Sequence, residues 1–306
     1  MEAEAMTKIT LDKDVLIANI RTQFANSNQL KYKRAMFEFE DSAGGFLGDN
    51  VFETSFLLRD NQPPLIYEVS GPYDVISNEY ATIGRIYESG QRIFECDMKD
   101  QIQQRTAAMV TLFFDAIGHQ PKKILIVGAG KLATEMVEYL KHSLPGLSAI
   151  DYHARTQRAD TFEANCTSIG VRAIYQPDLT LAGYDTIIMV TNTATCLVDA
   201  GNIDTVLQDG AVIASLCTTS QVGEIAGEVY GRDDINVIFD YDLTRSFTPD
   251  MRAADHAGHL KHVTFLTDIL RDHPVPALAD KKTILRITGT PMQNVAVLDM
   301  MHTISS

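Results

Sequence analysis

The sequence predicts an α/β protein in which a doubly wound parallel sheet is inserted into a discontinuous α+β domain. Three observations predict this fold. A strand pattern, a Gly-x-Gly turn and a helix start follow one another at 123–133, strand and helix patterns alternate from there to about residue 271, and mostly strand-like segments come before. Strands that alternate with helices of this length favour a parallel sheet with right-handed crossovers.

The first hundred residues predict a helix followed by a mostly antiparallel sheet. Apolar residues fall at helical spacing over 12–26. Strand patterns at 35–39, 54–58 and 83–87 are separated by turns rich in glycine and proline. A long helical pattern over 101–118 then leads into the central region.

The central region begins with an aliphatic run that ends in a Gly-x-Gly turn. Glycine lets the backbone approach a pyrophosphate, and the unpaired N–H groups of the following helix attract that anion. This is the turn of a Rossmann nucleotide-binding domain, although an ordinary glycine-rich strand–helix turn is the alternative. The residues predicted to bind a dinucleotide here are Gly128, Ala129, Gly130, Lys131 and Leu132.

The rest of the chain continues the alternation. Strands are predicted at 123–127, 148–152, 171–175, 185–190, 211–216 and 236–240, and helices at 131–143, 157–168, 200–207, 221–229 and 258–271. A final strand at 283–288 and a helix at 292–302 are expected to return to the first domain. The predicted limits are therefore 1–106 plus 282–306 for one domain and 107–281 for the nucleotide-binding domain.

Charge and composition exclude several classes of protein. The formal net charge of −14 argues against a nucleic-acid partner or an anionic membrane surface. The four cysteines are scattered and the chain start lacks the apolar segment of a signal peptide, so we expect a cytoplasmic protein with no membrane span. His256, His259 and His262 are expected to lie near one face of a solvated helix, and no metal site is expected.

Three segments of the chain resemble the ornithine cyclodeaminase/mu-crystallin family. They are 97–108, which contains Arg105-Thr106-Ala107-Ala108, the turn at 127–130, and the closing stretch 283–296. The resemblance implies that the discontinuous domain binds substrate and forms a homodimer, while the Rossmann domain binds NAD(H) or NADP(H). A long antiparallel sheet with edges to cover agrees with a homodimer.

The same resemblance points to the residues that would hold a small carboxylate-bearing substrate. In the family, an Arg before Thr-Ala-Ala binds the substrate carboxylate, and the two-donor fork of Arg105 suits that group. Arg34 and Arg59 lie roughly where the family places further cations, and a surface salt bridge is the alternative for each. Thr106 is predicted to contact the cofactor.

The end of the second central strand bears on the choice of cofactor. An acidic residue there would bind the ribose 2′-OH of NAD, whereas an Arg accommodates the 2′-phosphate of NADP. Asp151 lies within or at the tip of this strand, and Arg155-Thr156 resembles the pair of NADPH-using relatives, which favours NADP(H) over NAD(H). Thr191-Asn192-Thr193 follows the strand at 185–190 and is a further candidate for cofactor contact, a plain polar loop being the alternative.

Two positions depart from the family pattern. Thr218 and Asn294 stand where relatives carry acidic residues, and neither side chain ionises at neutral pH to act as a general base. Hydride delivery to a protonated imine needs no such base. The sequence therefore predicts an NAD(P)H-dependent oxidoreductase that reduces a small imino acid or ketimine, or interconverts an amino acid and its imine. An amino-acid cyclodeaminase with bound NAD and a non-catalytic, crystallin-like NADPH-binding protein are the alternatives.

Overall fold

The computed structural model describes most of the chain. That part comprises residues 11–40, 46–59, 62–74, 79–80, 82–155, 157, 159–191, 195–216, 223–242, 244, 248–272 and 281–306. The chain divides into a first unit, residues 1–105 plus 290–306, and a second unit, residues 106–289.

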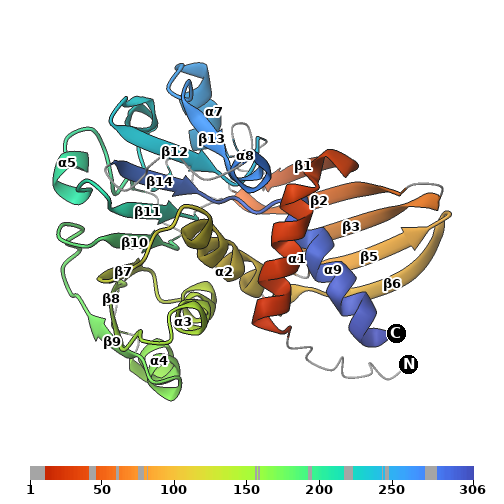
Figure 1. Cartoon of the computed structure of the whole chain (residues 1–306), viewed down its shortest axis with the longest axis horizontal. Coiled ribbons are helices and arrows are strands. Elements are labelled where there is room, and N and C mark those ends of the chain that lie inside the picture. The colour runs from red at the N-terminus through yellow and green to blue at the C-terminus, as the bar shows by residue number, and fades with distance from the viewer. Residues whose placement is uncertain are drawn as a thin grey trace. The chain divides into compact units, whose positions relative to one another are not determined.

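In the described residues, the first unit is an antiparallel sheet with helices from both ends of the chain beside it (Figure 1). Its strands run in the order β1-β2-β3-β5-β6, and the short strand β4 pairs with β3. The elements are α1 (Lys13–Ala25), a 3₁₀ turn (Ser27–Gln29), β1 (Leu30–Glu40), β2 (Phe46–Arg59), β3 (Gln62–Asp74), β4 (Glu79–Tyr80), β5 (Ile83–Glu88), β6 (Gln91–Asp97) and α9 (Pro291–Ser305). Helix α2 (Lys99–Ala116) begins in this unit and continues into the second.

Helices α1 and α9 form close to the limits that the sequence predicts. Helix α1 is capped by Asp12, whose carboxylate accepts a hydrogen bond from the Val15 backbone N–H at 3.0 Å, and it buries Leu16, Ile20 and Phe24. Helix α9 contacts α1 and the strands β2, β3 and β5, so the last segment of the chain completes the first unit, as Figure 1 shows.

In its described residues, the second unit is built on a parallel sheet of eight strands in the order β13-β12-β14-β11-β10-β7-β8-β9. Its strands are β7 (Ile124–Val127), β8 (Ala149–His153), β9 (Arg172–Tyr175), β10 (Thr186–Met189), β11 (Val212–Ser215), β12 (Ile235–Phe239), β13 (Val263–Phe265) and β14 (Lys282–Arg286). Its helical segments are α3 (Lys131–Ser143), a π-helical turn (Ala159–Glu163), α4 (Ala164–Ser168), α5 (Ile203–Val206), a 3₁₀ turn (Gly227–Gly231), α7 (Pro249–His256) and α8 (Leu266–Asp272).

Apolar side chains cover both faces of this sheet. Leu125 and Val127 of β7 join a core cluster that includes Ile203 of α5 and Met251 of α7. The alternate residues of the same strand, such as Ile126, point to the other face and are also buried. A parallel sheet covered on both faces is expected to show such continuous apolar runs, and the predicted doubly wound α/β fold is confirmed.

The strand predicted at 283–288 lies in a different place from the one expected. Strand β14 pairs in parallel with β11 and β12, with Ile284 opposite Ile213 and Val237, so it belongs to the second unit rather than to the first. The two units meet at residues 289 and 290 instead of 282. The physical reason is that Ile284 and Leu285 are both fully buried, which suits a strand between two parallel neighbours.

The helix predicted at 258–271 is only partly present. Helix α7 ends at His256, and Gly258, with a φ of +75°, adopts the left-handed conformation that commonly ends a helix. Strand β13 and helix α8 follow. The three histidines therefore share no helix face, because His259 and His262 lie between α7 and β13. Among the described residues, no cluster of three or more metal-ligating side chains occurs.

Two further observations concern the described residues. No helix there has the length and apolar character needed to cross a membrane. Cys96, Cys166 and Cys196 are free thiols, and burial raises the pKa of Cys96 and of Cys166 to about 12. Thiols with raised pKa values are poor nucleophiles at neutral pH, so Cys96 and Cys166 are packing residues.

Candidate functional site

The turn between β7 and α3 requires glycine at its first position. Gly128 has a φ of +120°, and a Cβ built on it would lie 2.6 Å from the carbonyl oxygen of Val190. Its N–H donates to the carbonyl oxygen of His153 at 2.8 Å, which ties the turn to the end of β8. A side chain at this position would force the turn away from both neighbouring strands.

The helix start beyond this turn is open to an anion. Gly130 caps α3 without a side-chain hydrogen bond, and the first turn of α3 holds no acidic residue. A Cβ on Gly130 would meet no atom within 4 Å. Ala133 packs fully buried beneath this turn. Strand β7 lies between β8 and β10, where the strand order reverses, which is the place where such sheets bind nucleotides. The residues present therefore fit a dinucleotide pyrophosphate.

A cationic side chain follows the end of β8. Asp151 lies inside the strand, and its carboxylate accepts a hydrogen bond from the Tyr184 hydroxyl at 2.7 Å. Burial and this carboxylate raise the pKa of Tyr184. The strand ends at His153, and Arg155, two residues further on, is exposed. Thr156 falls outside the described residues.

Beyond β10 the chain is held by a buried carboxylate. Glu224, which is 1% exposed, accepts hydrogen bonds from the Thr191 N–H at 3.0 Å, the Thr191 hydroxyl at 2.7 Å and the Ser215 hydroxyl at 2.7 Å. The hydroxyl of Thr191 is thus used within the protein to fix the loop that follows β10. Asn192, Thr193 and Thr218 fall outside the described residues, so their predicted roles stay predictions.

In the first unit, Arg105 is buried. Its side chain and backbone together are 6% exposed, and its Nη1 donates to Oε1 of Gln293 on α9. Because α2 begins at Lys99, Arg105 lies beyond the first helical turn. The helix dipole acts mainly within the first turn, so it opposes the positive charge of Arg105 only weakly. The hydrogen bond with Gln293 matters more for this side chain.

A second buried polar pair involves the next residue of α9. Asn294 donates from Nδ2 to Oε1 of Glu53 on β2 at 2.6 Å, and the two residues are 4% and 3% exposed. Glu53 lies opposite Arg34 in the register of β1 and β2. The side chain of Arg34 falls outside the described part of the structure, so its predicted role stays a prediction. Arg105, Gln293, Asn294 and Glu53 are hereafter the amide cluster.

Comparisons with known proteins agree with this geometry. The sequence matches no family model and no curated protein. Solved structures do match: a probable ornithine cyclodeaminase from Bordetella pertussis Tohama I superposes with a TM-score of 0.76 at 18% identity, covering 96% of this chain and 92% of that one. The chain has the ornithine cyclodeaminase fold.

Two further structures with this fold were solved with ligands. One is a Δ¹-pyrroline-2-carboxylate reductase from Thermococcus litoralis in complex with NADH and L-proline, with a TM-score of 0.78 at 14% identity, covering 96% of this chain and 93% of that one. The other is an archaeal alanine dehydrogenase dimer with bound NAD, with a TM-score of 0.75 at 15% identity, covering 96% of this chain and 91% of that one. At these identities the likeness shows the fold.

Within this fold, Arg59 is engaged at the sheet surface. It donates to the carbonyl oxygen of Pro63 and forms an ion pair with Glu88 at 2.6 Å, and its side chain is 24% exposed. This is the geometry of the surface salt bridge that the sequence left open as the alternative.

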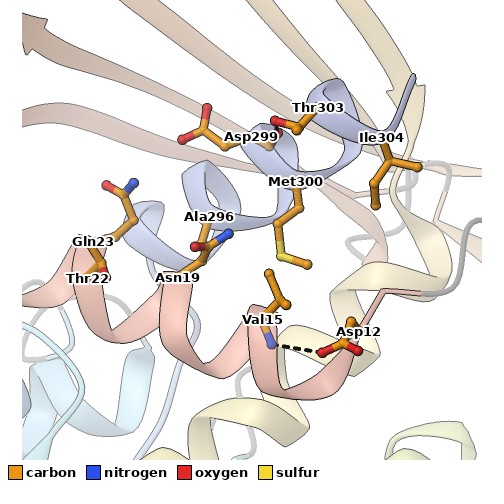
Figure 2. Close-up of a pocket in the computed structure, with 10 residues that line it drawn as sticks. All are labelled: Asp12, Val15, Asn19, Thr22, Gln23, Ala296, Asp299, Met300, Thr303 and Ile304. Atoms are coloured by element: carbon orange, nitrogen blue, oxygen red, sulfur yellow. Dashed lines mark hydrogen bonds between the residues drawn. The ribbon is translucent and has the colours of Figure 1, made fainter. Parts of the chain in front are cut away.

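A hollow of about 400 Å³ lies between α1 and α9 (Figure 2). Its lining includes the carboxyl groups of Asp12 and Asp299 and no cationic side chain, so it does not suit a carboxylate ligand. Val15 and Ile304 are 48% and 58% exposed on its walls. Asp299 accepts a hydrogen bond from the Tyr67 hydroxyl at 2.5 Å, and burial raises the pKa of this carboxyl group.

Sequence reasoning missed Gln293, Glu53 and Glu224. Gln293 and Glu53 meet their partners only in the folded chain, because Arg105 and Asn294 are far from them in sequence. An isolated Glu in a strand or loop pattern favours exposure, and nothing local marks these two glutamates as buried. The one available signal was Gln293 itself, a polar residue among the apolar residues of the closing helix.

Proposed function

We propose that this protein is an NAD(P)H-dependent oxidoreductase that reduces a small imino acid or ketimine, or interconverts an amino acid and its imine. The observation that carries this proposal is the turn at Gly128 and Gly130, which leads into an uncapped helix start at the strand-order reversal of a parallel sheet. Bound NAD(P)H would supply the hydride. Gly128, Ala129, Gly130, Lys131 and Leu132 would hold its pyrophosphate.

The amide cluster supplies the substrate site in this proposal. Arg105 would bind the substrate carboxylate, because its guanidinium offers a planar fork of donors inside a buried polar environment. Asn294 takes no proton at neutral pH, and reduction of an already protonated imine requires no base. The substrate-bound neighbour with L-proline and the chemistry of the cluster agree on a small amino or imino acid.

For the cofactor, we favour NADP(H) over NAD(H). Asp151 is held inside β8 by Tyr184 and does not reach the tip, whereas Arg155 stands exposed just beyond it. A cation at this place suits the 2′-phosphate. The two solved neighbours contain NADH and NAD, so this preference is a proposal about this chain alone.

For assembly and location, we propose a cytoplasmic homodimer that forms through the antiparallel sheet. Strands β1 and β6 are at the ends of the strand order and each has one partner strand among the described residues. Such edges are commonly covered by another chain. The alanine dehydrogenase neighbour is a dimer. Light scattering that gave only the 33.8 kDa monomer at micromolar concentration would contradict the dimer.

The test of the function is a substrate screen with purified protein. NADPH and NADH are each mixed with cyclic ketimines, and separately with 2-oxo acids plus amines, while cofactor oxidation is followed by absorbance. Oxidation that depends on an imine is the expected result. Ammonia release from ornithine or lysine without net cofactor consumption would instead identify a cyclodeaminase. Cofactor binding without any turnover would leave a binding protein.

A further inference from the structure

We propose that Gln293 and Asn294 form an oriented donor–acceptor pair that selects a substrate with an N–H group next to its carboxylate. The pair would therefore accept an amino acid or a protonated imine and reject the corresponding oxo acid. This inference rests on the proposed function, because it takes the amide cluster to be the substrate site.

The orientation of the Gln293 amide is fixed by its partner. A guanidinium can donate hydrogen bonds and cannot accept them, so Arg105 can bind only the oxygen of the Gln293 amide. The nitrogen Nε2 is then turned away from Arg105. Gln293 is 0% exposed, and its Nε2 has no hydrogen-bond partner among the described residues. Gln293 therefore presents a donor beside the guanidinium.

The orientation of the Asn294 amide is fixed in the opposite sense. Oε1 of Glu53 accepts a hydrogen bond from the nitrogen Nδ2 of Asn294. The oxygen Oδ1 is turned away from Glu53. Asn294 is 4% exposed, and this oxygen has no hydrogen-bond partner in the described part of the chain. Asn294 therefore presents an acceptor.

Two more unsatisfied oxygens accompany this pair. Oε1 of Gln104, which precedes Arg105, and Oγ1 of Thr290, the residue before α9, are buried and likewise lack a described hydrogen-bond partner. Folded proteins satisfy the large majority of buried polar atoms, because leaving them unsatisfied is costly. The four atoms belong to α2 and to the start of α9, which the Arg105–Gln293 hydrogen bond joins, and a ligand bound there would satisfy them.

The two presented atoms define the ligand. A carboxylate oxygen accepts from Nε2 of Gln293 while Arg105 binds the same group. The adjacent atom must then donate to Oδ1 of Asn294. The nitrogen of an amino acid or protonated imine has an N–H for this purpose, whereas the carbonyl oxygen of an oxo acid has only lone pairs. Oδ1 of Asn294 and the carbonyl oxygen of an oxo acid are both acceptors and repel each other in a buried site. The site therefore discriminates against the oxo acid.

The test uses three acids of matched shape on the NADPH-loaded protein. L-Proline carries an N–H beside the carboxylate, cyclopentanecarboxylate carries a CH₂ there, and tetrahydrofuran-2-carboxylate carries an ether oxygen. Binding to the wild type is measured by calorimetry. We expect L-proline to bind about 10- to 100-fold more tightly than the ether acid, the range for a buried polar group left without its partner. The CH₂ acid should fall between them.

Two variants separate the amide orientation from simple charge. Asn294→Leu removes the acceptor and keeps the Glu53 carboxylate, so the preference for L-proline over the ether acid should fall below about 3-fold. Glu53→Gln keeps the shape of the side chain but lets residue 53 donate as well as accept, so Asn294 can turn over and the preference should fall likewise. A preference that survives Asn294→Leu and disappears in Glu53→Gln would overturn the proposal, because Glu53 itself would then select the nitrogen.

Controls keep the outcome decisive. Glu68→Gln makes the same change on the neighbouring strand, at a residue paired with Arg85, and should leave the preference unchanged. Thermal unfolding checks each variant, and Asn294→Ala replaces the Leu variant if the latter does not fold. If the wild type binds all three acids equally and Arg105→Lys weakens them all, the proposed function stands and this inference falls. If the wild type binds none of them, both fall.

Discussion

Two sets of buried polar groups, one in each unit, are used in opposite ways. In the second unit, Asp240 is 0% exposed and accepts hydrogen bonds from the hydroxyl of Thr244, from the Thr288 N–H at 2.9 Å and from the Gly289 N–H at 3.1 Å. In the first unit, Gln293 and Asn294 are buried just as deeply, yet each uses only one end of its amide among the described residues.

This difference separates groups that hold the fold from groups that await a ligand. A carboxylate whose acceptor sites are filled by the chain can do nothing else, and it rigidifies the loop that it binds. An amide that a charged partner orients, and that has a hydrogen bond at only one end, lowers the stability of the folded protein slightly. Its other end is already positioned to bind a substrate. Stability lost at such a site is a common cost of function.

The sharpest test of the comparison is removal of the filled carboxylate. Asp240→Ala leaves the buried N–H groups of Thr288 and Gly289 without acceptors, so it should lower the free energy of unfolding by on the order of 3 kcal/mol. Urea unfolding measures this loss. The comparison variant Gln104→Leu removes a buried amide whose oxygen has no described partner, and it should cost less than about 1 kcal/mol. Equal losses in the two variants would break the comparison.

A second prediction concerns Arg155, which follows strand β8 of the second unit. Arg155 is exposed beyond β8, unlike the enclosed Asp151, and it is proposed to bind the 2′-phosphate. Arg155→Ala should weaken NADPH binding by about 1.5–3 kcal/mol, the range for a charge-assisted hydrogen bond, and should hardly affect NADH. Fluorescence titration with both cofactors measures the two changes. Equal losses would show that Arg155 does not recognise the phosphate.

A third prediction concerns the guanidinium of the amide cluster. Arg105→Lys keeps the positive charge and loses the planar fork, so only the bidentate geometry is tested. It should lower kcat/KM for the imine found in the screen by about 5- to 150-fold, or 1–3 kcal/mol, and leave NADPH affinity nearly unchanged. Steady-state kinetics and a cofactor titration give the two values. An equal fall in both would assign Arg105 to the cofactor or to the fold.

The sequence predicted most of the second unit because its strands are short apolar runs between turns. Strands β7 to β12 all lie within a residue or two of their predicted limits. The pattern of β14 also predicted a strand, but a buried run does not show which sheet it joins. Its place between β11 and β12 depends on long-range packing. The turn at Gly258 was read as part of a helix because its left-handed backbone is invisible in the apolar periodicity.

The candidate site was predictable only in part. Arg105 and the Gly128 turn belong to local motifs, so both could be named from the sequence. The partners that give Arg105 and Asn294 their orientation come from α9 and β2, far along the chain, and are set by the tertiary fold. Asp151 shows the same limit, because only the contact with Tyr184 places it inside the strand instead of at the cofactor end.

The smallest expected effect concerns Asp299 in the first unit. Its carboxyl group accepts a hydrogen bond from Tyr67, but burial disfavours its negative charge. Burial raises the pKa of this carboxyl group, although the hydroxyl of Tyr67 donates to it and His302 also acts to lower the pKa. A carboxyl group with a raised pKa binds its proton more tightly in the folded state than in the unfolded chain. Its contribution to stability is therefore full below the unfolded pKa and is lost as pH rises through the folded pKa.

Asp299→Asn should consequently stabilise the protein at neutral pH. The amide oxygen can still accept from Tyr67, and the variant has no charge to desolvate. The gain in the free energy of unfolding should be small and should shrink as pH falls through the raised pKa of the wild-type carboxyl group, which then becomes protonated. Urea unfolding at several pH values measures it. Asp12→Asn, on the same hollow, should change little, because Asn also caps a helix well. If Asp299→Asn instead lowers stability equally at every pH, Tyr67 requires a carboxylate partner, and Asp299 belongs with the filled carboxylates of the second unit.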